Sequence, residues 1–340
     1  MRKTIVTLVA LCAAMTANAT ILRVSNVNGS TAPYSTIQAA HDAASEGDTI
    51  MVDGSDTEYE MAVIKQRVVI IGPGYWINEN GLVQEAAPSA ATQLEIRSTA
   101  VGTVVEGLSF NKNLNWGIKI NADNCIVRRC NFYHGASNRA IVFGRDDSED
   151  RTPDPKGGVI HQNFFYDSKI ETTNTKAAMT NVQITNNIFV NDIPEPHINN
   201  FVASYMAYNT MLSSIKYGTT GATAFRNVYA STIEHNIIRL SKDLEDKYIK
   251  LSWSSVSDDN NEWNDNYEVH PFDINYKTDK DIRDLESLID QSGIYGAFAG
   301  DSPYVISGIP AAPVIQDLVV PATVEAGNKM KVTIKLGIQK

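Results

Sequence analysis

The stretch "ITNNIF", residues 184–189, decides the fold because its pattern recurs along the middle of the chain. In each copy, an apolar residue is followed by two variable residues, a position that is usually Asn, one variable residue and a second apolar residue. The other copies are "VEGLSF" (105–110), "VRRCNF" (127–132), "IHQNFF" (160–165), "MAYNTM" (206–211) and "IEHNII" (233–238). Their fourth positions lie 22 to 33 residues apart. Repeats of this length, rich in β-branched and aromatic residues and without a helical period, indicate a β-solenoid.

The stacking of coils accounts for this pattern. One coil cannot bury its own inward face, so we expect the apolar first and sixth positions to pack on those of the next coil. We expect the fourth-position side chains to form a hydrogen-bonded column at the bend between them, with Asn in the left-handed backbone that such a bend requires. The predicted column comprises Cys130, Asn163, Asn187, Asn209 and Asn236.

The residues before the repeat predict a helix and earlier coils. Ser35 is the expected N-cap of the helix and Gly47 is placed to end it, with Ile37, Ala40 and Ala44 on one face. Such a helix would cover the open end of the first coil, where strand edges are otherwise unpaired. Earlier coils are expected at "TIMV" (49–52), "VVII" (68–71) and "LEI" (94–96).

A family resemblance covers residues 34–240. The stretch "TIQAAHDAASEGDTIMV" (36–52), followed by "VVIIGPG" (68–74) and the Asn-bearing coils, resembles the N-terminal cap and first turns of right-handed parallel β-helix proteins of the pectin lyase-like class. The resemblance implies an all-β fold, a right-handed parallel β-helix with an N-terminal capping helix.

The repeat fades after Ile238, and two different patterns follow. Residues 279–293 predict a short amphipathic helix, and residues 308–335 alternate like two strands joined by "EAGN". The predicted division is a signal peptide at 1–19, a parallel β-helix with its caps at 20–308, and a C-terminal β-hairpin appendage at 309–340.

The N-terminus and the charge balance predict an exported protein. Arg2 and Lys3 precede an apolar run and the triplet Ala17-Asn18-Ala19, a pattern typical of a secretory signal peptide. We therefore expect a secreted, periplasmic or cell-surface protein. The formal net charge of -10 argues against nucleic acid as the main partner, and no later apolar run is long enough to span a membrane. Cys125 and Cys130 are too far apart along an extended chain for a disulfide, so two buried thiols are expected.

A short motif offers one candidate site. The run "RTPDPKGGVIH" (151–161) is similar to a motif of pectate lyases, although Lys156 stands where that family has Arg. The resemblance implies that Arg151, Lys156 and Arg139 act on a uronate, and that Asp146 and Asp147 are candidate Ca²⁺ ligands. In β-elimination, cations neutralise the uronate carboxylate and a base removes the adjacent proton. Alternatively, residues 144–158 are a surface insertion.

The surrounding residues favour a polysaccharide partner. Eight cations and six acids lie between Lys112 and Lys156, a local balance of +2 that suits an acidic glycan. We expect Lys119, Trp116 and His134 to bind substrate, because aromatic faces and cations line sugar sites. Three functions remain open: binding or processing of a polysaccharide, uronate lyase activity, and a non-catalytic surface or adhesion component.

Overall fold

The computed structural model describes most of the repeat region and parts of its flanks. The described residues are 19–77, 87–111, 114–133, 139–144, 155–172, 179–191, 197–213, 224–229, 231–241, 262–263, 268–272, 279–289, 293–310, 313–319 and 332–338.

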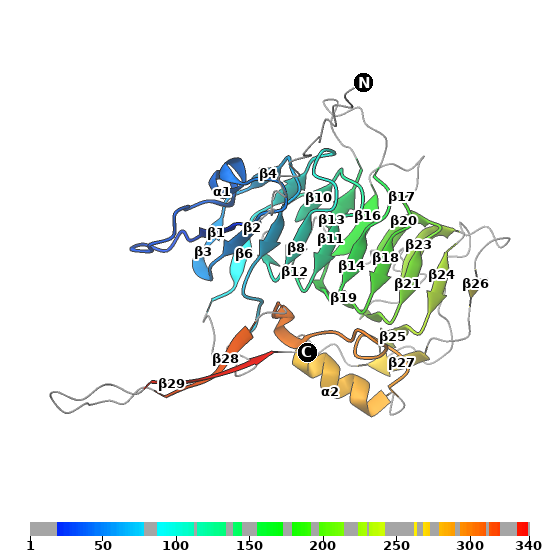
Figure 1. The fold of residues 1–340 in the computed structure, drawn as a ribbon. Helices are drawn as coiled ribbons and strands as arrows, with labels where there is room; N and C mark the ends of the chain where they lie inside the picture. Colours follow the sequence, from blue (N-terminus) through cyan, green and yellow to red (C-terminus); the bar gives the residue numbers. More distant parts are fainter. Residues whose placement is uncertain are drawn as a thin grey trace, which may run out of the picture.

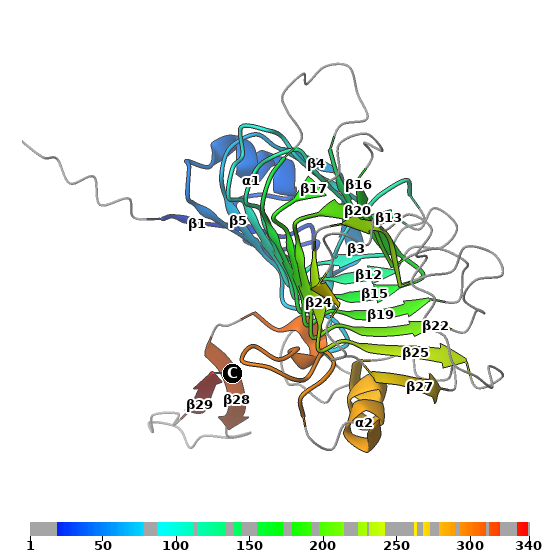
Figure 2. The same cartoon turned by 90° about the vertical axis from the view of Figure 1, so that its right-hand side faces the viewer.

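Three sheets, each parallel throughout, contain most of the described strands (Figures 1 and 2). Sheet 1 contains β1 (Ile21–Val24), β2 (Thr49–Val52), β5 (Val69–Ile71), β8 (Val104–Glu106), β11 (Ile126–Arg128), β14 (Val159–His161), β18 (Gln183–Thr185), β21 (Tyr205–Ala207), β24 (Thr232–Glu234) and β26 (Glu262–Trp263). Sheet 2 contains β3 (Ser55–Tyr59), β6 (Ser89–Ala91), β9 (Ser109–Phe110), β12 (Asn131–Tyr133), β15 (Phe164–Tyr166), β19 (Ile188–Asn191), β22 (Thr210–Ser213), β25 (Ile237–Ser241) and β27 (Glu268–Phe272). Sheet 3 contains β4 (Ala62–Ile64), β7 (Leu94–Ile96), β10 (Ile118–Ile120), β13 (Arg139–Phe143), β16 (Lys169–Thr172), β17 (Met179–Thr180), β20 (Ile198–Val202) and β23 (Phe225–Tyr229).

The chain visits the sheets in the order 1, 2, 3 and then returns to sheet 1, and we call each such passage a coil. The prediction of an all-β chain built from parallel sheets is confirmed. The arrangement is consistent with a parallel β-helix.

The first and sixth positions of the repeat are in register from coil to coil. In sheet 1, Val127 pairs with Val105 on one side and Ile160 on the other. In sheet 2, the rings of Phe110, Phe132, Phe165 and Phe189 stack in one column, with centroids 4.6 to 5.1 Å apart. These side chains are fully buried, so the apolar positions of the repeat form the core.

The four asparagines form one column at the bend from sheet 1 to sheet 2. The Oδ1 atom of Asn187 accepts hydrogen bonds from the backbone N–H and the side-chain amide of Asn163, at 2.9 and 3.0 Å. Asn187 donates in the same way to Asn209, which donates to Asn236. The backbone N–H of Cys130 donates to Asn163 at 3.0 Å and so continues the column. Each asparagine thereby satisfies a buried backbone donor of the preceding coil.

The left-handed backbone lies one residue earlier than expected. Positive φ occurs at the third repeat position, and the asparagines at the fourth position lack it. The third-position residues are Gly107, Arg129, Gln162, Asn186, Tyr208 and His235, with φ between 53° and 69°. The Asn column therefore depends on side-chain hydrogen bonds, and the expectation that these asparagines take the left-handed conformation is wrong.

Helix α1 (Ile37–Ala43) packs against β1, β2 and β4. Its N-cap is Thr36, whose side chain accepts a hydrogen bond from the N–H of Ala39, so the expected cap at Ser35 is off by one residue. Ile37 and Ala40 are fully buried against the first strands.

Residues 293–310, here called the return segment, run back along the bend that holds the asparagines (Figure 1). The segment includes the 3₁₀ turn η3 (Ile306–Gly308). It forms hydrogen bonds with several coils, through third-position residues and through the turn after β5. The bonds are Gly296 N–H to His235 O, the Asn186 amide to Ala299 O, the Gln162 amide to Pro303 O, the Arg129 guanidinium to Ile309 O, and Tyr75 N–H to Ser307 O.

A second apolar cluster covers the outer face of sheet 2. Helix α2 (Asp279–Ile289) contributes Ile282, and the return segment contributes Ala297 and Tyr304. They pack against Phe164, Tyr166, Ile188, Val190 and Leu212 from the sheet.

Two expectations from the sequence concern the thiols and the C-terminal strands. Cys125 and Cys130 are free and buried, as predicted. Strands β28 (Pro313–Val319) and β29 (Thr333–Ile338) pair antiparallel, whereas the division of the chain at residues 308 and 309 stays a prediction. Among the described residues, no helix is both long and apolar enough to cross a membrane.

Replacing Asn187 by Leu is expected to lower the free energy of unfolding by about 1 to 3 kcal/mol, because the buried donors of Asn163 and the carbonyl of Ile160 lose their partner. Urea denaturation would measure this. The exposed Gln183 on the same coil provides a control, since Gln183→Ala should leave stability nearly unchanged. An Asn187→Leu protein as stable as the wild type would show that the column does not stabilise the fold.

Acidification is expected to destabilise the protein through two histidines. Burial lowers the pKa of His161 to about 4 and the pKa of His197 to about 3, from an ordinary value of 6.5. Since the unfolded chain takes up these protons first, their contribution to stability is complete above pH 6.5 and is lost progressively as the pH falls below that value. Urea midpoints measured across this range should fall with pH, and less steeply for His161→Gln. Equal slopes would contradict the role of His161.

Candidate functional site

Charged residues lie on the outer face of sheet 3, where strand alternation turns every second side chain away from the core. Glu95, Lys119, Val142 and Glu171 are aligned across β7, β10, β13 and β16, between inward-facing apolar neighbours. Glu95, Lys119 and Glu171 are only 4 to 6% exposed. Buried charge on the outer face of a sheet is costly and marks a candidate functional site. We call these residues and their ion-pair partners the charged column.

Glu171 anchors the tighter end of the charged column. One carboxylate oxygen lies 2.6 Å from Arg139 Nε and the other 3.1 Å from Lys169 Nζ. Arg139 and Lys169 are in register at the start of their strands, so both cations reach the same carboxylate. The Arg139 side chain is 39% exposed, which leaves part of its guanidinium accessible.

Glu95, at the other end of the charged column, has longer ion-pair distances. Its oxygens lie 3.3 Å from Arg97 and 3.9 Å from Lys119, and Oε1 has no hydrogen-bond partner. Asn121, two residues after Lys119 on the same side of the chain, is 2% exposed, and both of its side-chain amide atoms lack partners. Unsatisfied buried polar groups cost free energy, which makes these atoms candidates for contacts with a water or a ligand.

Among the described residues, the charged column contains four cations and two carboxylates. The cations are Arg97, Lys119, Arg139 and Lys169. Glu95 and Glu171 are three strand spacings apart, about 14 Å. The column therefore offers several positive groups over a length greater than one sugar ring.

The structure brings together two of the residues expected from the sequence, Lys119 and Arg139. Trp116, half-buried, lies just before β10 and its carbonyl accepts a hydrogen bond from the Gln93 amide. Arg151, His134, Asp146 and Asp147 lie outside the described residues. Within the described ranges, no group of three His, Cys, Asp or Glu side chains could hold a metal ion.

Lys156 is not brought together with Arg139. Arg139 begins β13, whereas Lys156 lies at the bend from sheet 3 into sheet 1, where its backbone N–H donates to Asp123 at 2.8 Å. The length of β13, about 13 Å, separates the two ends of the sheet. These two cations therefore lie at opposite ends of the sheet 3 strands.

His161 has partners within the fold. Its Nδ1 lies 2.8 Å from the Thr185 hydroxyl, and its Nε2 lies 3.0 Å from the Ser302 hydroxyl of the return segment. Ile160, Asn163 and Phe165 of the same coil are fully buried in their repeat positions.

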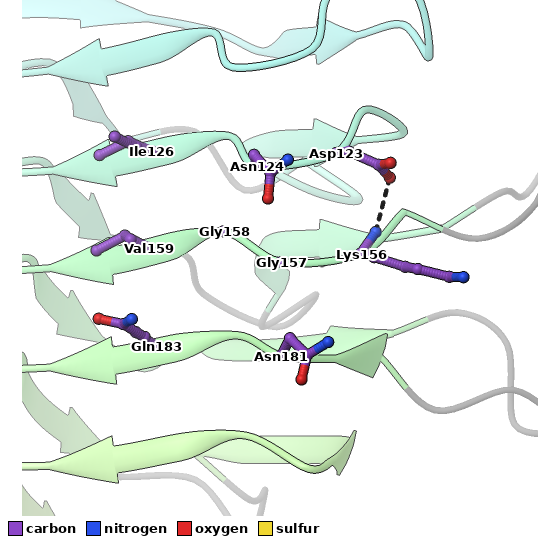
Figure 3. A pocket seen from close by; sticks show the side chains of 9 residues that line it. All are labelled: Asp123, Asn124, Ile126, Lys156, Gly157, Gly158, Val159, Asn181 and Gln183. Carbon is purple, nitrogen blue, oxygen red and sulfur yellow. Dashed lines mark hydrogen bonds between the residues drawn. The ribbon is translucent and has the colours of Figure 1, made fainter.

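The bend that carries Lys156 forms a pocket of about 430 Å³ (Figure 3). Asn124, Gly157 and Asn181 come from three successive coils, and Ile126 and Val159 line the pocket on the side of sheet 1. A neighbouring pocket of about 360 Å³ shares Asn181 and Gln183 and extends to Tyr205 and Thr232.

Comparison with family models, curated proteins and solved structures found no match. The candidate sites therefore depend on the residues of this chain.

Sequence reasoning missed Glu95, Glu171 and Asn121. A signal for the two glutamates and Lys119 was present in "LEI" (94–96), "IKI" (118–120) and "KIET" (169–172), where a charged residue follows the inward-facing one in the strand. Without the register between these strands, nothing in the sequence shows that the charges share one face.

The two glutamates are expected to respond differently to removal of their charge. Glu171→Gln should lower the free energy of unfolding by about 1 to 3 kcal/mol, because two closely paired cations lose their carboxylate. Glu95→Gln should cost clearly less, since its contacts are longer and one oxygen accepts no hydrogen bond. Chemical denaturation of both variants tests this, and equal losses would show that Glu95 is as important for stability as Glu171.

Proposed function

We propose that this chain is an exported right-handed parallel β-helix protein of the pectin lyase-like class that binds an acidic polysaccharide along the charged column. The class rests on the resemblance of residues 34–240 together with the three parallel sheets. Export rests on the signal peptide expected at residues 1–19.

The charged column is the observation that carries the proposed partner. Buried ion pairs contribute little to stability once desolvation is counted, so a column of them on an outer face calls for another role. Within the described part of the column cations outnumber carboxylates, and Arg139 and Arg97 retain exposed surface. A planar guanidinium recognises a carboxylate through two parallel hydrogen bonds, which suits the uronates of acidic glycans.

The geometry supports binding along the axis of the coils. Neighbouring strands are about 4.8 Å apart, so the groups of the charged column are spaced along the axis of the coils, and Arg139 and Arg97 are the ones with substantial exposed surface. Lys119, Glu95 and Glu171 lie beneath that surface and position the guanidinium groups.

Lyase activity is a separate hypothesis within the same class. It requires a base and a group that neutralises the carboxylate beside one ring. Lys156 and Arg139 lie apart, and Arg151, Asp146 and Asp147 lie outside the described residues. No described residue favours cleavage over binding, so the lyase and the adhesion component stay predictions from the sequence.

Binding of polygalacturonate tests the proposal. The affinity measured by calorimetry should fall about tenfold or more in Arg139→Gln, because a charge-assisted contact is lost. Added salt should also weaken wild-type binding. Arg23→Gln is the matched control, since Arg23 pairs with Asp53 on sheet 1, away from the charged column.

Two results would contradict the proposal: no binding by the wild-type protein, or equal loss in Arg23→Gln. Thermal unfolding of each variant shows whether the fold is intact. Ultraviolet absorbance of unsaturated uronate products in the same samples, with and without Ca²⁺, tests the lyase hypothesis separately.

A further inference from the structure

The pocket at the bend from sheet 3 into sheet 1 arises from an alternation of Asn and Gly. Asn124, Gly157 and Asn181 occupy equivalent places in three successive coils, with φ of 55°, 69° and 58°. Gly and Asn are the residues that tolerate this left-handed backbone. Hydrogen bonds connect these bends: the N–H of Asn124 donates to the carbonyl of Lys156, and the N–H of Gly157 donates to the carbonyl of Thr180. The carboxamides of Asn124 and Asn181 therefore flank Gly157, which has no side chain.

The glycine makes room for the amide of Asn124. A Cβ placed on Gly157 would lie 2.3 Å from Asn124 Oδ1, so the Asn124 side chain leans over the gap. Figure 3 shows its oxygen directed toward the Gly157 coil. Gly158 follows with φ 128°, and a Cβ there would lie 3.0 Å from the carbonyl oxygen of Cys125. The two consecutive glycines thus make room for the Asn124 amide and for the backbone at Cys125.

The lining combines an apolar floor with exposed amides. Ile126 and Val159 are half-buried and in register, and Gln183 stands next to Val159 in the following coil. Asn124, Asn181 and Gln183 are exposed. Each carboxamide offers a donor and an acceptor side by side, which matches the vicinal hydroxyls of a sugar. An apolar floor suits the C–H face of the ring, and the volume is typical of small-molecule sites.

The charges at the rim cancel. Asp123 and Lys156 are of opposite sign, and Asp123 accepts the backbone N–H of Lys156. Figure 3 shows the Lys156 side chain extending away from the pocket. The remaining lining residues carry no charge, so this pocket differs from the charged column in the ligand that it selects.

We infer that the two adjoining pockets bind two consecutive uncharged sugar units, with Asn124, Asn181 and Gln183 bonding their hydroxyls. The first pocket holds one unit between Asn124 and Asn181. The second, which shares Asn181 and Gln183, holds the next beside Tyr205 and Thr232. This site does not rest on the proposed function, because it uses other residues and a ligand without charge.

The test uses cellotetraose, mannotetraose and maltotetraose as neutral probes and tetragalacturonate as the charged one. At least one neutral probe should bind the full chain in calorimetry, with an affinity that does not change with salt. In Asn124→Gly/Asn181→Gly, which keeps residues suited to positive φ, that affinity should fall about tenfold, since two amide contacts are lost. The matched control is Gly29→Asn, an exchange of the same kind at φ 81°, where an added Cβ meets nothing within 4 Å and which is not among the residues that line the two pockets.

The inference is overturned if no neutral probe binds, if the double variant binds as well as the wild type, or if only tetragalacturonate depends on Asn124 and Asn181. Should thermal unfolding show that the double variant is damaged, Gln183→Ala, at an exposed strand position, takes its place with the same expected direction. Failure of polygalacturonate to bind would count against the charged column alone. Binding at the charged column should weaken with added salt, whereas binding of a neutral probe at the pockets should not.

Discussion

The bend between sheets 1 and 2 is the constraint on which the rest of the structure depends. Its third residue takes a left-handed backbone in every coil from Gly107 to His235, and the four asparagines at its fourth position each accept the buried N–H of the coil before. Arg, Gln, Tyr and His accept a conformation that costs them energy, because the hydrogen bonds and the stacked core around them fix it. Once this corner is fixed, the register of sheets 1 and 2 follows, and the apolar positions of successive coils coincide.

The sequence was sufficient for the parts of the fold that repeat. The first and sixth positions, the Asn column and the buried thiols could be predicted because each depends on one local pattern copied from coil to coil. The left-handed residue was misplaced by one position, because Asn tolerates that backbone. The residue type alone could not distinguish the left-handed position from the position whose side chain forms the hydrogen-bonded column. The charged column could not be predicted in full, since it depends on register in sheet 3, where strand lengths and intervening loops vary. Lys119 and Arg139 were found through local charge, whereas Glu95 and Glu171 are distant in sequence from them.

The two candidate sites show how one scaffold presents different chemistry on neighbouring surfaces. The inward positions are constrained by stacking and are almost entirely apolar. The outward positions and bends are free to vary from coil to coil, and there the chain places ion pairs on sheet 3 and amides with glycines at the bend into sheet 1. Because both surfaces follow the same axis with the same spacing, each is suited to a linear polymer.

The return segment changes how such a stack responds to stress. In a simple solenoid each coil contacts only its neighbours, so the ends fray one coil at a time. Here residues 293–310 bond coils as distant as those of His235 and Tyr75, and buried Tyr304 and Asp279 hold the segment in place through Tyr75 and Ser307. Unfolding of the C-terminal coils therefore requires the return segment to dissociate, and this segment is also hydrogen-bonded to the early coils. The coils are thereby linked into one mechanical unit, which would resist proteases that attack frayed ends.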